Sequence, residues 1–252
     1  MRTLLLTLAY DGRAYHGWQI QNNADTVQAR LQDALAQVFG AAPAIKGCSR
    51  TDSGVHARMF CVSFSTDASS PCERLIPALN VKLPRDIAVT SCREVPEGFH
   101  ARYDCAGKRY SYEIWNSPVK NPFLDRLATN WKYPLDAERM KLSGLPLLGT
   151  HDCSALCAAG SSVDPKDPDA DTVRTITHFD VVRQGDMVKI TVAADGFLYN
   201  MVRIIAGTLL DMEAGRIAFD SMADIIASRD RGRAGHTAPP DGLYLDEVFY
   251  NL

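Results

Sequence analysis

A polar stretch, residues 49–57, separates two apolar segments and holds the densest group of reactive side chains in the chain. Asp52 lies two residues after Arg50 and four before His56. A carboxylate between basic groups keeps a low pKa and stays ionised near neutral pH, as a nucleophile or an electrostatic anchor must. The same residues also suit an ordinary turn, with Gly54 at positive φ and Arg50 in a surface ion pair. Residue types alone favour the ordinary turn.

A second group contains His151, Cys153 and Cys157. These residues could hold a metal ion, or Cys153 could act with His151 in a cysteine hydrolase. Two cysteines with one histidine fall short of a zinc pattern, and no oxyanion donor or orienting group can be assigned to a hydrolase. We therefore expect buried or incidental thiols and no metal. Nucleotide cofactors are not expected, because no Gly-x-Gly-x-x-Gly follows a strand and no Gly-Lys-Ser/Thr closes a phosphate loop.

The elements that must position the turn have a β-α-β-β-α-β order. Apolar residues alternate over 3–10, which predicts a strand, and their spacing of three or four over 27–38 predicts a helix. Asp25 or Thr26 can cap this helix, and Gly40 can end it. The other elements expected in this half are strands at 44–49 and 59–64 around the turn, a helix at 70–79 and a strand at 87–94.

The second half repeats this order. Its expected elements are strands at 108–115, 173–182, 187–194 and 243–250, and helices at 137–147, 200–214 and 221–228. Two consecutive split β-α-β units imply an α+β fold of two related lobes, 1–105 and 106–252, whose antiparallel or mixed sheets join edge to edge. The junction is expected within 99–107. Residues 164–169 are polar and broken by proline, which predicts a mobile loop.

Composition limits the class of protein. The chain has 252 residues, 46% hydrophobic residues and a formal net charge of −3, so it can bury a large core and has no global positive field. Seven cysteines without a Cys-x-x-Cys pair indicate reduced thiols. The short apolar stretch near the N-terminus lacks a cleavage site, and no run approaches the ~20 residues that span a bilayer. We expect a cytoplasmic protein without a membrane partner.

Five segments resemble, in register and in order, the motifs of the TruA family of tRNA pseudouridine synthases. They are residues 10–19 (Tyr-Asp-Gly and Tyr-His-Gly-Trp-Gln), 50–57 (Arg-Thr-Asp-Ser-Gly-Val-His-Ala), 99–102 leading into 108–112, 195–203 and 237–245. Two departures are minor, because Ser49 and Ser53 occupy positions that are Gly and Ala in the family. Met59 and Phe60 stand where the family has a Gly-Gln-Val run. We expect these two residues to alter a pocket wall beside Asp52 and to shift the choice of target uridine.

The resemblance implies a pseudouridine synthase fold with a catalytic cleft between the lobes. The reaction detaches uracil, turns it and rejoins it through carbon, so it needs no cofactor. The resemblance assigns the catalytic carboxylate to Asp52, which could attack C1′, add to the base or remove the 2′ proton. Tyr110 would stack on the target base and could accept a proton. Arg203 lies in an apolar helix and needs an acidic partner, for which Asp52 is the best candidate.

The family's members are homodimers that act on tRNA uridines 38, 39 and 40 in the anticodon stem-loop. The resemblance therefore implies a tRNA substrate, a homodimer and a flipped-out base. Candidate substrate-binding residues are Arg50, His56, Arg58, Arg102, Lys108, Arg109, Phe197 and Leu243. Two local clusters with a net charge of +2 could bind phosphates. They are Lys46, Arg50 and Arg58 around Asp52, and Arg229, Arg231 and Arg233 around Asp230.

A non-catalytic tandem RNA-recognition module is the main alternative, because that module has the same order of elements. Its RNA-binding strand requires a glycine and a run of aromatic residues. Residues 58–64 contain two aromatics and no glycine. The sequence therefore favours the enzyme.

Overall fold

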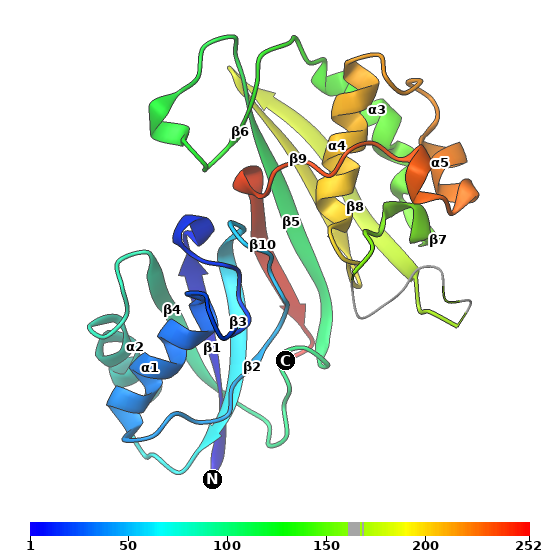
Figure 1. Cartoon of the computed structure of the whole chain (residues 1–252). Coiled ribbons are helices and arrows are strands. Elements are labelled where there is room, and N and C mark those ends of the chain that lie inside the picture. Colours follow the sequence, from blue (N-terminus) through cyan, green and yellow to red (C-terminus); the bar gives the residue numbers. More distant parts are fainter. Residues whose placement is uncertain (161–166, 168) are drawn as a thin grey trace. The chain divides into compact units, whose positions relative to one another are not determined.

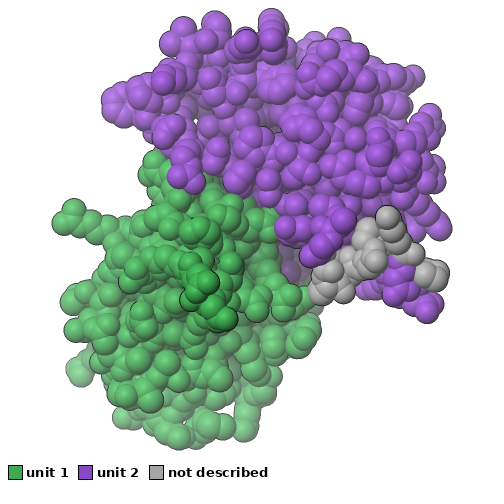
Figure 2. Space-filling view, viewed as in Figure 1, with its two compact units in different colours: residues 1–106, 244–252 green, residues 107–243 purple. Residues whose placement is uncertain are grey.

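The computed structural model describes residues 1–160, 167 and 169–252, and within them it is a mixed α+β protein of ten mostly antiparallel strands and five α-helices (Figure 1). The expected α+β class is confirmed. The chain divides into two compact units, which Figure 2 shows in different colours. Unit 1 comprises Met1–Ala106 and Tyr244–Leu252, and unit 2 comprises Gly107–Leu243. No helix in the described part of the chain has the length and apolar character needed to cross a membrane.

The sheet of unit 1 is built around β1 (Arg2–Tyr10). This strand pairs antiparallel with β3 (His56–Thr66) on one side and with β4 (Ile87–Val95) on the other. β2 (Lys46–Gly47) pairs with β3, and the C-terminal strand β10 (Leu243–Tyr250) runs parallel to β3. Leucine side chains of β1 are fully buried, because the strand lies between two neighbours and beneath a helical layer.

Two helices, α1 (Val27–Phe39) and α2 (Cys72–Asn80), pack on this sheet (Figure 1). α1 begins and ends as expected. The Thr26 side chain accepts a hydrogen bond from the Ala29 N–H, so Thr26 and not Asp25 is the cap. Gly40 ends the helix with a φ of 83°, which a residue with a side chain rarely adopts.

The strands that flank the polar turn differ from the expected ones. The strand expected at 44–49 is only two residues long, and β3 begins at His56 and not at residue 59. The extension has a physical cause, because Tyr244 and Leu245 of β10 pair with His56 and Ala57. Such a partner, far away in the sequence, leaves no local signal.

The strands of the ten-stranded sheet that lie in unit 2 pair antiparallel in the order β5 (Cys105–Asn116, its first two residues counted with unit 1), β9 (Met187–Ala194), β8 (Val173–Gln184) and β7 (Gly149–Asp152). β6 (Thr129–Trp131) pairs parallel with β5. The strands β6 and β7 were not expected, because three or four residues are too few for an alternation signal. The helices of this unit are α3 (Ala137–Gly144), α4 (Met201–Glu213) and α5 (Met222–Ser228).

Two further expectations differ from the structure. The helix expected at 137–147 ends at Gly144 and continues as a 3-10 turn that contains Pro146, whose ring removes a backbone donor. The residues from Tyr244 onward belong to unit 1, whereas the sequence placed them in the second lobe. Their pairing with β3 explains this grouping. The loop expected at 164–169 lies outside the described residues, apart from Asp167 and Asp169.

Candidate functional site

The loop that carries Asp52 is fixed in unit 1 by the segment that follows β1. The Trp18 N–H donates to the Thr51 carbonyl over 3.1 Å, and the Gly54 N–H donates to the Tyr15 carbonyl over 3.2 Å. Below them the Tyr10 and Thr51 hydroxyls lie 2.8 Å apart in the interior. These bonds hold Thr51 and Gly54, on either side of the half-buried Asp52 and Ser53. The backbone that carries the Asp52 carboxylate is therefore fixed within unit 1.

Two glycines allow this close approach. A Cβ on Gly12 would lie 2.0 Å from the Val55 carbonyl oxygen, and one on Gly17 would lie 2.4 Å from the Thr51 carbonyl oxygen. Gly17 also has a φ of 90°. Any larger residue would push the loop away. The structure thus brings together the first two segments that carried the resemblance, 10–19 and 50–57.

His56 lies in the interior, with 1% of its surface exposed. Its Nδ1 accepts a hydrogen bond from the Gly12 N–H over 3.1 Å, and its ring stacks on Tyr244 at 4.6 Å between centroids. The side chain is enclosed within its own unit, and its contact with substrate stays a prediction. His56 ties the start of β3 to the segment after β1.

Asp11 lies beside this histidine, with its carboxylate 3.2 Å from His56 Nδ1. Burial opposes ionisation of Asp11, but the hydrogen bonds and the charge of Arg13 outweigh it, and the pKa of Asp11 falls below its usual value. Asp11 is thus an anion that the sequence analysis did not single out.

Phe60 also departs from its expected place. It is fully buried, stacks on Trp18 at 4.1 Å and contacts Tyr10 at 5.7 Å between ring centroids. It therefore belongs to the core beneath the loop and forms no pocket wall, which corrects the expectation. Its neighbour Met59 is half-exposed, since successive side chains of a strand point to opposite faces.

The basic candidates of unit 1 differ in their surroundings. The Arg58 guanidinium contacts Asp246 at 2.5 Å and lies 3.9 Å above the Tyr244 ring, so β10 holds it. Arg50 and Arg102 are exposed. The backbone beside Arg102 is fixed, because the Ala101 N–H donates to Ser63 and its carbonyl accepts from the Tyr250 hydroxyl.

In unit 2, Tyr110 projects from β5 opposite Val192 of β9 and is 7% exposed. The Phe197 ring meets it edge-on, with centroids 5.0 Å apart and planes at 80°. Lys108 and Arg109 are half-buried on the same strand.

Arg203 lies in the first turn of α4. Its Nε donates to the Ala238 carbonyl and its Nη1 donates to the Asn200 side chain, both over 2.7 Å. The Ala238 N–H returns a bond to the Arg203 carbonyl over 3.1 Å. Asn200 holds its position in the left-handed region, with a φ of 59°. The segments 195–203 and 237–245 therefore meet at the guanidinium.

Residues 236–239 also contact β5 and the middle of α4. The Tyr112 hydroxyl donates to the Pro239 carbonyl over 2.8 Å, and burial raises the pKa of Tyr112. Leu243, which follows, is buried at the start of β10. Gly207 allows α4 to touch this segment, because a Cβ there would lie 1.8 Å from the His236 carbonyl oxygen.

Asp211, near the end of α4, is 7% exposed and was missed by the sequence analysis. It accepts hydrogen bonds from the His236 N–H at 2.9 Å and the His236 Nδ1 at 3.0 Å, and a third from Arg216. Burial opposes ionisation, but these bonds outweigh it and lower the pKa of Asp211. A carboxylate in a mostly apolar helix was the available signal, because such a group requires partners.

The second basic cluster is partly used inside unit 2. Arg229 pairs with Asp152 at 3.0 Å. Arg231 donates to the Gly235 carbonyl at 2.9 Å and to the Thr237 hydroxyl at 3.1 Å, and burial lowers its pKa. Arg231 therefore supports residues 234–237, and the binding of phosphates by the three arginines stays a prediction. Arg233 is exposed.

The alternative chemistries have no support in the described residues. Cys153 is 1% exposed, and burial raises the pKa of its thiol to about 11, which opposes a thiolate nucleophile. The His151 Nε2 is bonded to the Leu148 carbonyl oxygen at 3.0 Å. No group of three or more His, Cys, Asp or Glu side chains in the described residues could hold a metal ion.

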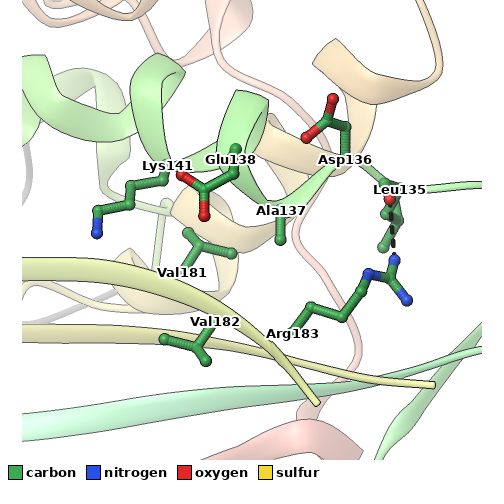
Figure 3. Close-up of a pocket in the computed structure, with 8 residues that line it drawn as sticks. All are labelled: Leu135, Asp136, Ala137, Glu138, Lys141, Val181, Val182 and Arg183. Carbon is green, nitrogen blue, oxygen red and sulfur yellow. Dashed lines mark hydrogen bonds between the residues drawn. The ribbon is translucent and has the colours of Figure 1, made fainter. Parts of the chain in front are cut away.

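A hollow in unit 2 lies between α3 and β8 (Figure 3). Arg183 reaches across it and donates to the Leu135 carbonyl over 2.9 Å, while Lys141 pairs with Asp180 at 2.9 Å. The hollow contains none of the expected site residues. It offers no reactive group.

Comparison with known proteins agrees with the motifs. The family model for tRNA pseudouridine synthase matches residues 7–104 and 146–251. The tRNA pseudouridine synthase A of Thermoanaerobacter sp. (strain X514) is 44% identical over 250 residues, which cover 99% of this chain and all of the relative. The enzyme of the same name from Acetivibrio thermocellus is 45% identical with the same coverage. The tRNA pseudouridine synthase A 2 of Clostridium perfringens is 43% identical, again with 99% and 100% coverage.

Proposed function

The chain belongs to the tRNA pseudouridine synthase family and is an isomerase that acts on tRNA, and we propose that it converts uridines 38, 39 and 40 of the anticodon stem-loop to pseudouridine. The observation that carries this proposal is Asp52, a half-buried carboxylate in a loop locked by backbone contacts. A catalytic carboxylate must keep its place while the uracil is detached, turned and rejoined. This loop cannot shift without breaking those contacts. The family assignment replaces the alternative of a non-catalytic RNA-binding module.

The proposed reaction begins with a uridine turned out of the RNA stack, at a cost of a few kcal/mol. The bond between N1 of uracil and C1′ of the ribose breaks, the base turns, and C5 bonds to C1′. The proton of C5 is lost and N1 gains one, so atoms balance without a cofactor. Asp52 acts on the sugar or on the base, as nucleophile or as base.

We assign two residues of unit 2 to the same uridine. Tyr110 stacks on the base, and the edge-on ring of Phe197 keeps the tyrosine in its orientation. Arg203 is the ion-pair partner of Asp52, because a guanidinium at the buried start of α4 requires an acid. Asn200 and Ala238 orient this guanidinium through their two hydrogen bonds.

The substrate is held by groups outside this centre. We assign phosphate contacts to the exposed Arg50 and Arg102 and to Lys108 and Arg109, with Arg58 restricted by Asp246. Leu243 forms an apolar wall near the base, and Met59 is the position where target choice differs from that of relatives. The enzyme is proposed to be a cytoplasmic homodimer.

The test is to incubate the purified protein with unmodified tRNA transcripts and to map pseudouridine at each position. We expect product at 38, 39 or 40, and none with Asp52→Asn. Product confined to other arms of the tRNA would disprove the regional assignment while leaving the isomerase activity in place. Product with Asp52→Asn would disprove the catalytic assignment.

A further inference from the structure

Two thiols meet at the edge of the unit 1 sheet, away from the Asp52 loop. Cys72 is the first residue of α2, and Cys92 lies in β4. Their sulfur atoms are 3.0 Å apart, with the Cys92 thiol donating to the Cys72 sulfur. Both side chains are half-buried, so a small reagent in solvent can reach them.

The two elements are held together at a second point. The Asn80 side chain, at the end of α2, donates to the Val89 carbonyl over 2.9 Å and accepts from the Val89 N–H over 2.7 Å. β4 is in turn fixed to β1 through the pairing of Cys92 with Leu6. The helix and the strand therefore cannot drift apart, and the sulfurs stay within reach of each other.

We propose that Cys72 and Cys92 are a modification site, at which a low-molecular-weight disulfide of the glutathione type converts the two thiols into an intramolecular disulfide between α2 and β4. The proposal is independent of the assigned tRNA position. It concerns cysteines that the isomerisation does not use.

The reaction is a two-step thiol–disulfide exchange. The Cys72 thiolate attacks one sulfur of oxidised glutathione, and the S–S bond breaks to release one glutathione thiol. The Cys92 thiolate then attacks the Cys72 sulfur of the mixed disulfide and releases the second glutathione. The protein loses two electrons and two protons, which oxidised glutathione takes up. Burial raises the pKa of Cys92, and its hydrogen points at Cys72, so Cys72 is the first attacker.

The disulfide would close a loop that runs through α2 and the connection to β4. Such a closure restricts the unfolded chain and stabilises the unit. Strand β1 separates β4 from β3, the strand at which the Asp52 loop ends, so the disulfide leaves the loop untouched. We expect an oxidised enzyme that resists unfolding and retains its turnover.

The experiment treats the reduced full-length protein with oxidised glutathione, blocks the remaining thiols by alkylation and measures intact and peptide masses. We expect a monomeric chain lighter by two hydrogens, without bound glutathione, in which the peptides of Cys72 and Cys92 are linked. The melting temperature should rise by about 5–10 °C and return after reduction with dithiothreitol. The kcat should change less than about two-fold.

Three variants complete the test. Cys72→Ser and Cys92→Ser should each abolish the mass loss and the thermal shift while melting like the reduced wild type. Cys105→Ser, at another half-buried thiol, should retain both effects. A stable glutathione adduct on Cys72, a link to another cysteine, or unchanged full-length thiols after treatment would overturn the proposal.

Discussion

Asp52 sits in a loop whose backbone is held at Thr51 and at Gly54, so a change of its charge can be separated from a change of its position. Asp52→Asn should fold and bind tRNA like the parent, because the amide nearly preserves the shape. Turnover should fall by about 1000-fold or more, since the amide is no anionic catalyst. Product formation on tRNA, with binding and melting measured beside it, checks this. Ser53→Ala is the matched control and should retain activity.

Tyr110 has two roles that can be separated. Tyr110→Phe keeps the stacking face and the edge-on contact with Phe197, whereas Tyr110→Leu loses both. If stacking holds the base, Tyr110→Phe should bind tRNA about 10-fold more tightly than Tyr110→Leu, in line with the 1–3 kcal/mol of a base stack. Equal affinities in a binding titration would contradict stacking. A loss of turnover by Phe with binding intact would identify the hydroxyl as the proton acceptor.

At the scale of elements, Asp211 joins α4 to residues 234–238 through its bonds with His236. The folded pKa of Asp211 lies below its usual 3.8, so its stabilising effect is present above that value and is lost as pH falls through the folded pKa. Asp211→Asn should lower stability at pH 7 by about 1–3 kcal/mol and flatten the loss of stability on acidification. Thermal melts from pH 7 to pH 3 measure both effects.

Asp211→Asn should also lower catalysis through Arg203. Because Ala238 orients Arg203, a looser 234–238 segment should lower kcat and leave KM nearly unchanged. Arg216→Gln is the control, since it removes only one exposed partner of Asp211 and keeps both bonds from His236. An equal effect of the two variants would show that the ion pair, and not the bonds to His236, matters.

The arginines after α5 differ by their surroundings. Arg231→Gln should lower the melting temperature by several degrees, because it removes the guanidinium that donates to the Gly235 carbonyl and to the Thr237 hydroxyl. Arg233→Gln should leave the melt unchanged, weaken tRNA binding alike for all tRNAs and reduce the salt slope by about one. Binding titrations at several salt concentrations distinguish them. An Arg231→Gln variant that melts like the parent but binds tRNA weakly would identify Arg231 as a phosphate contact.

For the whole molecule, the chemistry predicts independence from added metal and nucleotide. Enzyme treated with EDTA and freed of the chelator should retain full turnover, because the isomerisation balances without a cofactor. Activity that disappears and returns only with Zn²⁺ would make His151, Cys153 and Cys157 ligands after all. The assay keeps Mg²⁺ in the tRNA buffer throughout, since that ion also maintains the shape of the RNA.

Local patterns were enough to predict most of the elements and the reactive loop. Alternation over residues 3–10 marked β1, and the spacing in α1 with Thr26 and Gly40 marked both of its ends. The motif around Asp52 was visible because its residues are consecutive. These features depend on residues that are close together in the sequence, so the sequence alone is enough to recognise them.

Only the tertiary structure decided which candidate side chains contact other parts of their own unit. His56 is enclosed by Gly12 and Tyr244, Phe60 by Trp18, and Arg231 by its own following loop. β10 joined unit 1 because Tyr244 pairs with His56 of β3, far away in the sequence. Burial and strand pairing depend on partners far away in the sequence, and a local pattern contains no information about them.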